Sequence, residues 1–179
     1  MNPASGNDSD SLLRRAESAY ASGRVAEAEA IWQHLLTLDP GHPEALFHLG
    51  NRCRERGEHT AAIADYERAL ERVPGHAGLL NNLALTLEAI GKVERAEACY
   101  RDILTREPKQ PDALLNLANL RYRAARYTEA AALHQRAAAV IEAAHLREIG
   151  RLRHGIGDGV FLADERREPS QKLGRGRRC

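Results

Sequence analysis

Apolar residues recur along most of this chain at the spacing of one face of an α-helix, in short segments separated by glycine or proline. In Ala28, Ile31, Trp32 and Leu35 they lie three or four residues apart, which is the period of an amphipathic helix. The pattern predicts helices at 9–22, 25–38, 43–56, 59–72, 77–90, 93–106, 111–124 and 127–153.

The residues between these segments support the same boundaries. Glycine follows three of the segments, where a left-handed C-cap is favoured, and proline either opens a helix or prevents its continuation. The glycines are Gly23, Gly57 and Gly91, the opening prolines are Pro43 and Pro111, and the terminating prolines are Pro40, Pro74 and Pro108.

The pattern repeats every 34 residues without insertion, in the windows 9–42, 43–76, 77–110 and 111–144. Small residues stand at the eighth position (Ala16, Gly50, Ala84, Ala118) and at the twentieth (Ala28, Ala62, Ala96, Ala130). A large residue stands at the twenty-fourth position of each window (Trp32, Tyr66, Tyr100, His134). Small residues let two helices approach closely, and the large residues fill the remaining space.

These positions resemble the tetratricopeptide repeat, a helix–turn–helix unit, over about four fifths of the chain. The resemblance implies an all-α fold: a right-handed α-solenoid of four repeats plus a C-terminal capping helix. The pattern departs from the family at Arg15 in the first window and at Ala125, His134 and Glu142 in the fourth. Terminal repeats have a neighbour on one side only, so we expect such departures there.

The remaining segments are interpreted as follows. Residues 1–8 are expected to be a flexible N-terminus, and 145–154 to extend the last helix as a cap. From Gly155 the composition changes to glycine, proline, serine and charge, so 155–179 is predicted to be disordered.

Composition adds little beyond this. The chain is rich in alanine and leucine and carries a formal net charge of +1, which indicates no polyanionic partner, and no nucleic-acid binding is expected. The short basic clusters of the tail, such as Arg166-Arg167, are diluted by acidic residues. The sequence shows no secretion signal or membrane span, which predicts a cytoplasmic protein, and it implies no particular oligomeric state.

No catalytic, cofactor or metal site is predicted. The run Gly155–Gly159 lacks the preceding strand that a phosphate-binding loop requires. The histidines form no pair at metal-ligand spacing, and Cys53 and Cys99 fall on packing positions. The chain is therefore expected to be non-catalytic.

The resemblance implies that the first helix of each repeat lines a concave groove. Glu17 and Glu44 fall on groove positions, and the residues predicted to contact a protein or peptide partner are Tyr20, Phe47, His48, Asn51, Arg54, Asn81, Asn82, Glu88, Asn116, Asn119, Tyr122 and Arg123. Asparagine is unfavourable inside helices, and its amide can hold the backbone of a peptide. Asn82 and Asn116 each lie within an Asn-Leu-Ala triplet. Replacing both by alanine is predicted to weaken partner binding, with little effect on thermal stability. The alternative is that these asparagines make contacts within the repeats.

The predicted function is that of a scaffold or adaptor that binds an extended or helical segment. The basic clamp with which chaperone adaptors bind a C-terminal carboxylate is not matched, because Phe47, Asp112 and Asn116 occupy its positions. The Asn-Leu-Ala triplets also resemble the asparagine ladder of O-linked N-acetylglucosamine transferase. The alternative is therefore the repeat region, or a truncated relative, of such a glycosyltransferase without its catalytic domain.

Overall fold

The computed structural model describes residues 4–161 of the chain, and the side chains of residues 8–148. All regular secondary structure in this part is helical. The helices are α1 (Ala4–Ala21), α2 (Val25–Leu38), α3 (Pro43–Glu55), α4 (His59–Arg72), α5 (Ala77–Ala89), α6 (Val93–Arg106), α7 (Pro111–Arg123) and α8 (Tyr127–Phe161). The bounds of α2, α4 and α6 coincide with those that the sequence predicts.

Side chains of the connecting segments fix where three of the first helices begin. His42, His76 and Gln110 precede α3, α5 and α7, and each accepts a hydrogen bond from a backbone N–H of the first turn, at 3.4, 3.2 and 3.0 Å. Such caps satisfy N–H groups that have no partner within the helix.

The turns between the two helices of each repeat require a left-handed backbone. Gly23, Gly57 and Gly91 have φ values of 75°, 78° and 74°, which confirms the predicted C-caps. In the fourth repeat, Ala125 takes the same place with φ of 58°. The turn geometry is therefore kept where the glycine is absent.

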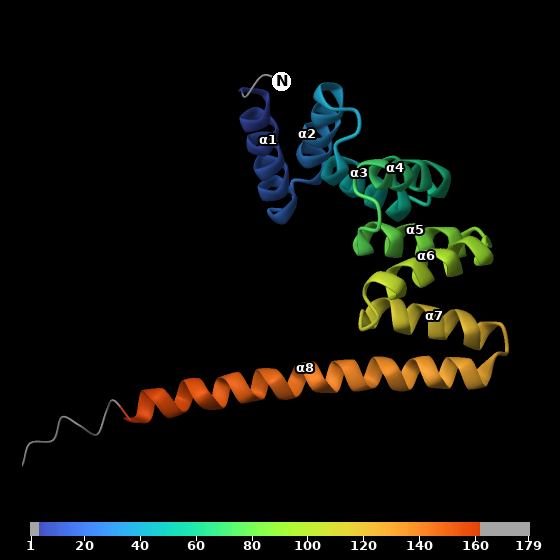
Figure 1. Cartoon of the computed structure of the whole chain (residues 1–179). Coiled ribbons are helices and arrows are strands. Elements are labelled where there is room, and N and C mark those ends of the chain that lie inside the picture. The colour runs from blue at the N-terminus through green and yellow to red at the C-terminus, as the bar shows by residue number, and fades with distance from the viewer. Residues whose placement is uncertain (1–3, 162–179) are drawn as a thin grey trace, which may run out of the picture. The chain divides into compact units, whose positions relative to one another are not determined.

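The chain divides into two compact units, residues 1–138 and 139–179. Within the first unit, each of α1 to α6 packs against the helix that follows it, and α3 also contacts α5 (Figure 1). One cluster of buried apolar residues joins α1, α2 and α3 around Trp32 and Leu35, and a second extends from α3 to α7 around Tyr66 and Tyr100. This is the arrangement of an α-solenoid of helical repeats.

The predicted pairing of small and large residues is present in this core. Trp32, Tyr66 and Tyr100 are fully buried. A Cβ atom added to Gly50 would lie 2.7 Å from Cε1 of Tyr66, so this helix contact has no room for a methyl group.

The ends of the chain differ from the expected boundaries. α1 begins at Ala4, within the segment expected to be flexible, and α8 continues to Phe161, beyond the Gly155 at which disorder is predicted to begin. The rest of the predicted disordered segment, 162–179, lies outside the described residues. In the second unit, Ile141 and Leu146 are 48% and 61% exposed. The cap formed by 145–154 stays a prediction.

Candidate functional site

The predicted groove residues lie on α1, α3, α5 and α7 and differ in accessibility. Tyr20, Asn119, Tyr122 and Arg123 are exposed. The others are half-buried, namely Phe47, His48, Asn51, Arg54, Asn81, Asn82, Glu88 and Asn116. Several of these half-buried side chains contact one another across neighbouring repeats.

The asparagines form two pairs between repeats. Asn82 on α5 donates from Nδ2 to Oδ1 of Asn51 on α3 at 2.8 Å, and the hydroxyl of Tyr66 donates to the same oxygen at 2.7 Å. Asn116 on α7 donates from Nδ2 to Oδ1 of Asn81 on α5, also at 2.8 Å. The predicted amides are thus brought together, and they hold successive repeats to each other.

A second group is aromatic and joins the first two repeats. His48 stacks on the buried Trp32 with ring centroids 4.4 Å apart and an angle of 4° between the planes. Tyr20 and Phe47 lie beside His48 at 6.3 and 5.4 Å. Burial lowers the pKa of His48, against the opposing effect of the negative charge of Glu17 and that of Glu44 on α3. The imidazole is therefore neutral at physiological pH.

Glu88 and Arg123 form the third contact among the predicted residues. They are joined by an ion pair between α5 and α7, and Glu88 also accepts a hydrogen bond from the Tyr100 hydroxyl at 2.7 Å. Burial and this hydrogen bond raise the pKa of Tyr100. The side chain of Glu88 is only 7% exposed.

The other predicted residues are less constrained. The side chain of Asn119 has no hydrogen-bond partner among the described residues, and Tyr122 makes an edge contact with Tyr127 at 5.3 Å. Tyr122 and Tyr127 are 61% and 59% exposed. The buried Nε of Arg54 has no hydrogen-bond partner in the described part of the chain.

A cavity of about 280 Å³ lies beside the aromatic group and includes residues that the sequence pattern does not single out. Phe47 and His48 line it together with Pro43, Glu44, Val73, His76 and Leu79. Val73 and His76 come from the connection between α4 and α5, so no spacing within one helix could reveal that they meet Phe47. The sequence contains one hint of these cavity residues: histidine recurs at the same position of two successive windows, as His42 and His76.

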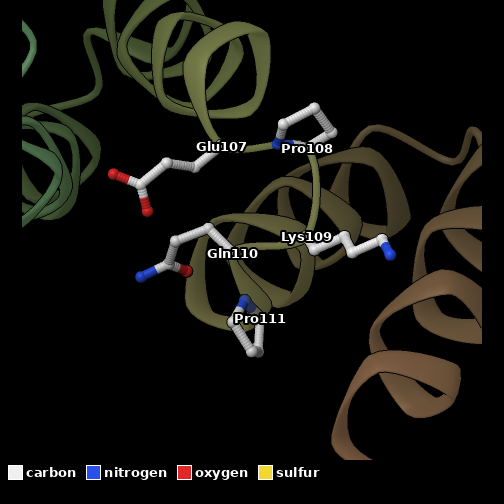
Figure 2. Close-up of a pocket in the computed structure, with 5 residues that line it drawn as sticks. All are labelled: Glu107, Pro108, Lys109, Gln110 and Pro111. Atoms are coloured by element: carbon white, nitrogen blue, oxygen red, sulfur yellow. The ribbon is translucent and has the colours of Figure 1, made fainter. Parts of the chain in front are cut away.

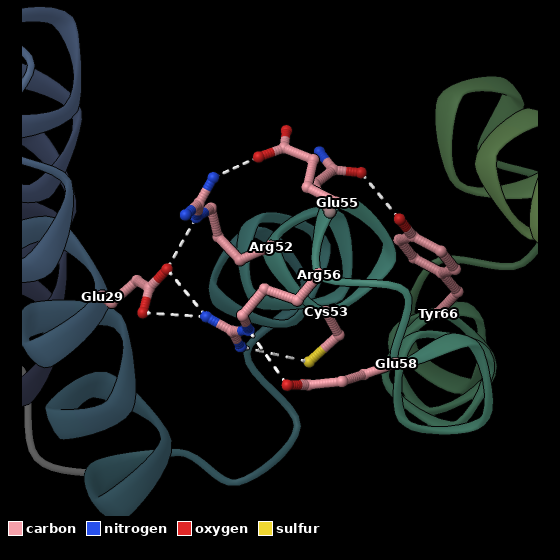
Figure 3. A network of polar contacts seen from close by, with 8 residues as sticks. Glu29, Arg52, Cys53, Glu55, Arg56, Glu58 and Tyr66 are labelled. Atoms are coloured by element: carbon pink, nitrogen blue, oxygen red, sulfur yellow. Dashed lines mark hydrogen bonds and ion pairs between the residues drawn. The ribbon is translucent and has the colours of Figure 1, made fainter.

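Ion pairs between repeats are a further feature that the sequence pattern does not reveal. Arg52 donates from Nε to Glu29 on α2 at 2.6 Å, and Arg56 donates to the same carboxylate at 3.1 Å (Figure 3). The hydrogen bond from Arg52 holds the pKa of Glu29 below its ordinary value. Glu97 and Arg121 form the corresponding pair between α6 and α7. Arg121, which is 5% exposed, donates a hydrogen bond of 2.8 Å from Nη1 to the carboxylate of Glu97.

A larger hollow of about 540 Å³ borders the connection between α6 and α7 (Figure 2). It is lined by the consecutive residues Glu107, Pro108, Lys109, Gln110 and Pro111. Gln110 already caps α7, and in Figure 2 Lys109 extends away from Glu107 and Gln110. These side chains do not converge on a common point, so we assign no site to this hollow.

The two cysteines of the described residues pack beside the core. Cys53 and Cys99 are half-buried, and burial raises the pKa of both thiols. A raised pKa favours the thiol over the nucleophilic thiolate. Their geometry agrees with the packing role that their positions predict.

Comparison with known structures places this arrangement among helical repeat proteins. A crystal structure of MamA superposes with a TM-score of 0.70 at 21% identity, over 78% of this chain and 82% of that chain. A tetratricopeptide repeat protein from Parabacteroides merdae gives 0.65 at 21% identity, over 73% and 52%. The first repeat domain of Spaghetti (RPAP3), bound to the HSP90 peptide SRMEEVD, gives 0.60 at 18% identity, over 65% and 93%. At these identities the likeness establishes the fold.

Sequence comparison identifies the repeat itself. No curated protein sequence matches the chain. Profiles of the tetratricopeptide repeat match residues 13–77, 54–109 and 113–144, which together span all four windows. None of the described helices combines the length and apolar character that crossing a membrane requires.

The repeat profiles, the helix pairs and the buried large residues all indicate the same repeat. The chain belongs to the tetratricopeptide repeat family.

Proposed function

We propose that this protein is a non-catalytic scaffold that binds an extended or helical segment of a partner protein along α1, α3, α5 and α7. Repeat proteins of this kind present a continuous surface built from equivalent helices, which suits recognition of a linear segment. The observation that carries the proposal is the row of amides on α3, α5 and α7, whose hydrogen-bonding capacity is only partly used.

The unused capacity can be assigned atom by atom. Oδ1 of Asn51 accepts two hydrogen bonds, whereas its Nδ2 has no partner among the described residues. Nδ2 of Asn81 is likewise without a partner in that part of the chain, because only its Oδ1 is engaged, by Asn116. An amide NH2 that is fixed through its own oxygen is pre-oriented to donate to a carbonyl. A peptide backbone supplies such carbonyls at regular intervals.

Apolar contacts would come from the accessible aromatic residues at the two ends of this row. Tyr20 on α1 and Tyr122 on α7 are 40% and 61% exposed. A tyrosine combines a large apolar face with a polar tip and loses little conformational entropy when it is covered. Tyr20 and Tyr122 are therefore the expected anchors, with Asn119 adding a free amide beside the second of them.

The absence of a basic clamp at the corresponding positions of this chain argues against binding of a C-terminal peptide carboxylate. In the Spaghetti structure the bound peptide, SRMEEVD, is an HSP90 peptide. At the positions where chaperone adaptors carry their basic clamp, this chain has Phe47, Asp112 and Asn116. A terminal carboxylate would meet no cation there, so the expected segment is internal to its protein.

A selection from a library of short random peptides tests the proposal. The purified chain is the bait, and peptides enriched by the wild type are measured again with the double variant Asn119→Ala with Tyr122→Ser. Both side chains are accessible and neither is part of the core, so the fold should be kept. The matched control is Thr60→Ala with Glu71→Ala on α4, at exposed positions of a second helix. Affinity that falls with the first variant but not with the control supports the groove, and equal affinity for both rejects it.

The asparagines also keep the glycosyltransferase alternative as a second candidate. The chain would then be the repeat region of such an enzyme, and the partner segment would be its substrate protein. A gene for a glycosyltransferase catalytic domain that adjoins or overlaps this one favours this candidate, whereas a gene neighbourhood for secretion or regulation favours the adaptor.

A further inference from the structure

We propose that the cavity between α3 and the start of α5 receives an arginine side chain of the bound segment, with Glu44 as its charge partner. This inference rests on the proposed groove function and names the chemistry of one part of the partner. It is carried by the cavity's walls, its volume and the balance of charge around it.

The cavity is lined by apolar residues together with a carboxylate and two imidazoles. Phe47, Val73 and Leu79 supply side chains that can pack against methylene groups. Glu44 also lines the cavity, and its side chain is 60% exposed, so the carboxylate stands between the cavity and water. A long side chain with an apolar stem and a cationic end matches this combination of surfaces.

The volume is sufficient for one side chain. About 280 Å³ lies just below the range typical of small-molecule sites, which begins near 300 Å³. It is ample for one extended side chain entering from the groove. The rings of Phe47 and His48 meet at an angle of 75°, and each offers an edge or face to a planar group. A guanidinium group stacks on such rings, whereas an ammonium group does so less well.

The charge around the cavity is not balanced by the chain itself. The carboxylates of Glu29, Glu55, Glu58, Glu88 and Glu97 each pair with an arginine. Among the described residues, Glu44 pairs with no lysine or arginine, and the same holds for Glu17, Glu71, Glu94 and Glu107; of these, Glu44 is the one that lines the cavity. The nearest basic group to Glu44 is Nδ1 of His42 at 3.5 Å.

Two imidazoles near the cavity already accept hydrogen bonds from backbone N–H groups through Nδ1. Nδ1 of His42 accepts a hydrogen bond from the N–H of Ala45 at 3.4 Å. His48, in the wall, is kept neutral by burial, and Nδ1 of His76 accepts from the N–H of Leu79. Glu44 thus lines the cavity without a lysine or arginine partner among the described residues, and Glu17 on α1 acts on the same imidazole of His48 as Glu44 does. A cationic side chain would complement this charge.

The test uses the peptides that the full chain selects from the random library. We expect arginine to be enriched at one position beside an apolar residue. In the tightest peptide, replacing this arginine by citrulline, which keeps the shape and removes the charge, should weaken binding by about tenfold. Glu44→Gln should weaken the arginine peptide to a similar extent and leave the citrulline peptide unchanged, because the two changes remove the same interaction.

The matched control is Glu94→Gln, which removes a carboxylate from the first turn of α6, away from the cavity residues. It should bind both peptides as the wild type does, and the melting temperatures of both variants should show that they fold. The inference is wrong if the selected peptides depend on Asn119 and Tyr122 but lack arginine, or if they bind equally well with citrulline. Either result would still support the proposed groove function. If no peptide depends on the groove, the proposed function fails and the inference fails with it.

Discussion

Asn82 Nδ2 lies 2.8 Å from Asn51 Oδ1, so this predicted groove amide joins the third repeat to the second. The same oxygen accepts a hydrogen bond from the Tyr66 hydroxyl. The sequence predicts that replacing Asn82 leaves thermal stability nearly unchanged. The observed contact lies between two repeats rather than within one, and replacing Asn82 would remove a donor from the half-buried oxygen of Asn51.

We therefore expect Asn82→Ala to lower the free energy of unfolding by about 1 kcal/mol, measured by urea denaturation. In a double-mutant cycle with Asn51→Ala, the coupling energy should be of the same order. Asn119→Ala is the control, because the side chain of this asparagine has no partner among the described residues. A change of stability equal to that of the control would show that the hydrogen bond does not contribute.

Gly50→Ala should be strongly destabilising. The added Cβ would lie 2.7 Å from Cε1 and 3.0 Å from Cδ1 of Tyr66, whose ring is fully buried and cannot move aside freely. Overpacking of this kind costs about 1–3 kcal/mol. The measurement is the unfolding free energy of Gly50→Ala in the wild type and in a Tyr66→Leu background. The cost should shrink when the ring is absent, and an equal cost in both backgrounds would contradict the steric explanation.

Ala125→Gly should stabilise the fourth repeat. Ala125 has φ of 58°, a conformation in which its Cβ is crowded by the backbone and which glycine adopts freely. After allowance for the greater freedom of glycine in the unfolded chain, we expect a gain of roughly 0.5–1 kcal/mol. The neighbouring Ala124 has φ of −82°, so Ala124→Gly should destabilise. Equal effects of the two substitutions would refute the argument.

His48 should make the stability depend on pH. Burial lowers the pKa of this imidazole below its ordinary value of 6.5, so the unfolded chain binds the proton more tightly than the folded one. Stability is then full above the unfolded value and falls as the pH decreases through 6.5 towards the folded value. The groups that face His48 are Glu17 and Tyr20 on α1, Trp32 on α2, and Glu44 and Phe47 on α3.

The measurement compares the melting temperature of the wild type and of His48→Gln from about pH 8 to about pH 5.5, which spans the ordinary histidine pKa. The variant should lose less stability than the wild type as the medium is acidified, whatever its stability at the higher pH. The control is His34→Gln, which replaces an exposed histidine outside the aromatic group. If the slope of His48→Gln equals that of the wild type, His48 is not the titrating group.

The sequence by itself determined the repeat, most helix boundaries and the turn geometry. These features depend on interactions between residues close in the chain: a helical face repeats every three or four residues, a glycine fits a left-handed turn, and a proline opens a helix or prevents its continuation. The period of 34 residues carries the same local pattern into each window, so Tyr66 and Tyr100 could be placed in the core from their position alone.

The tertiary structure alone decided which of the predicted groove residues remain available. The pairing of Asn51 with Asn82, the ion pair of Glu88 with Arg123, and the cavity that Phe47 and Val73 line all bring together residues far apart in the chain. Such contacts depend on the distance and angle at which two helices pack and on the rotamer that each side chain adopts. A spacing along the chain encodes the face on which a residue lies, and the packed neighbour then determines whether that residue meets solvent, a ligand or another repeat.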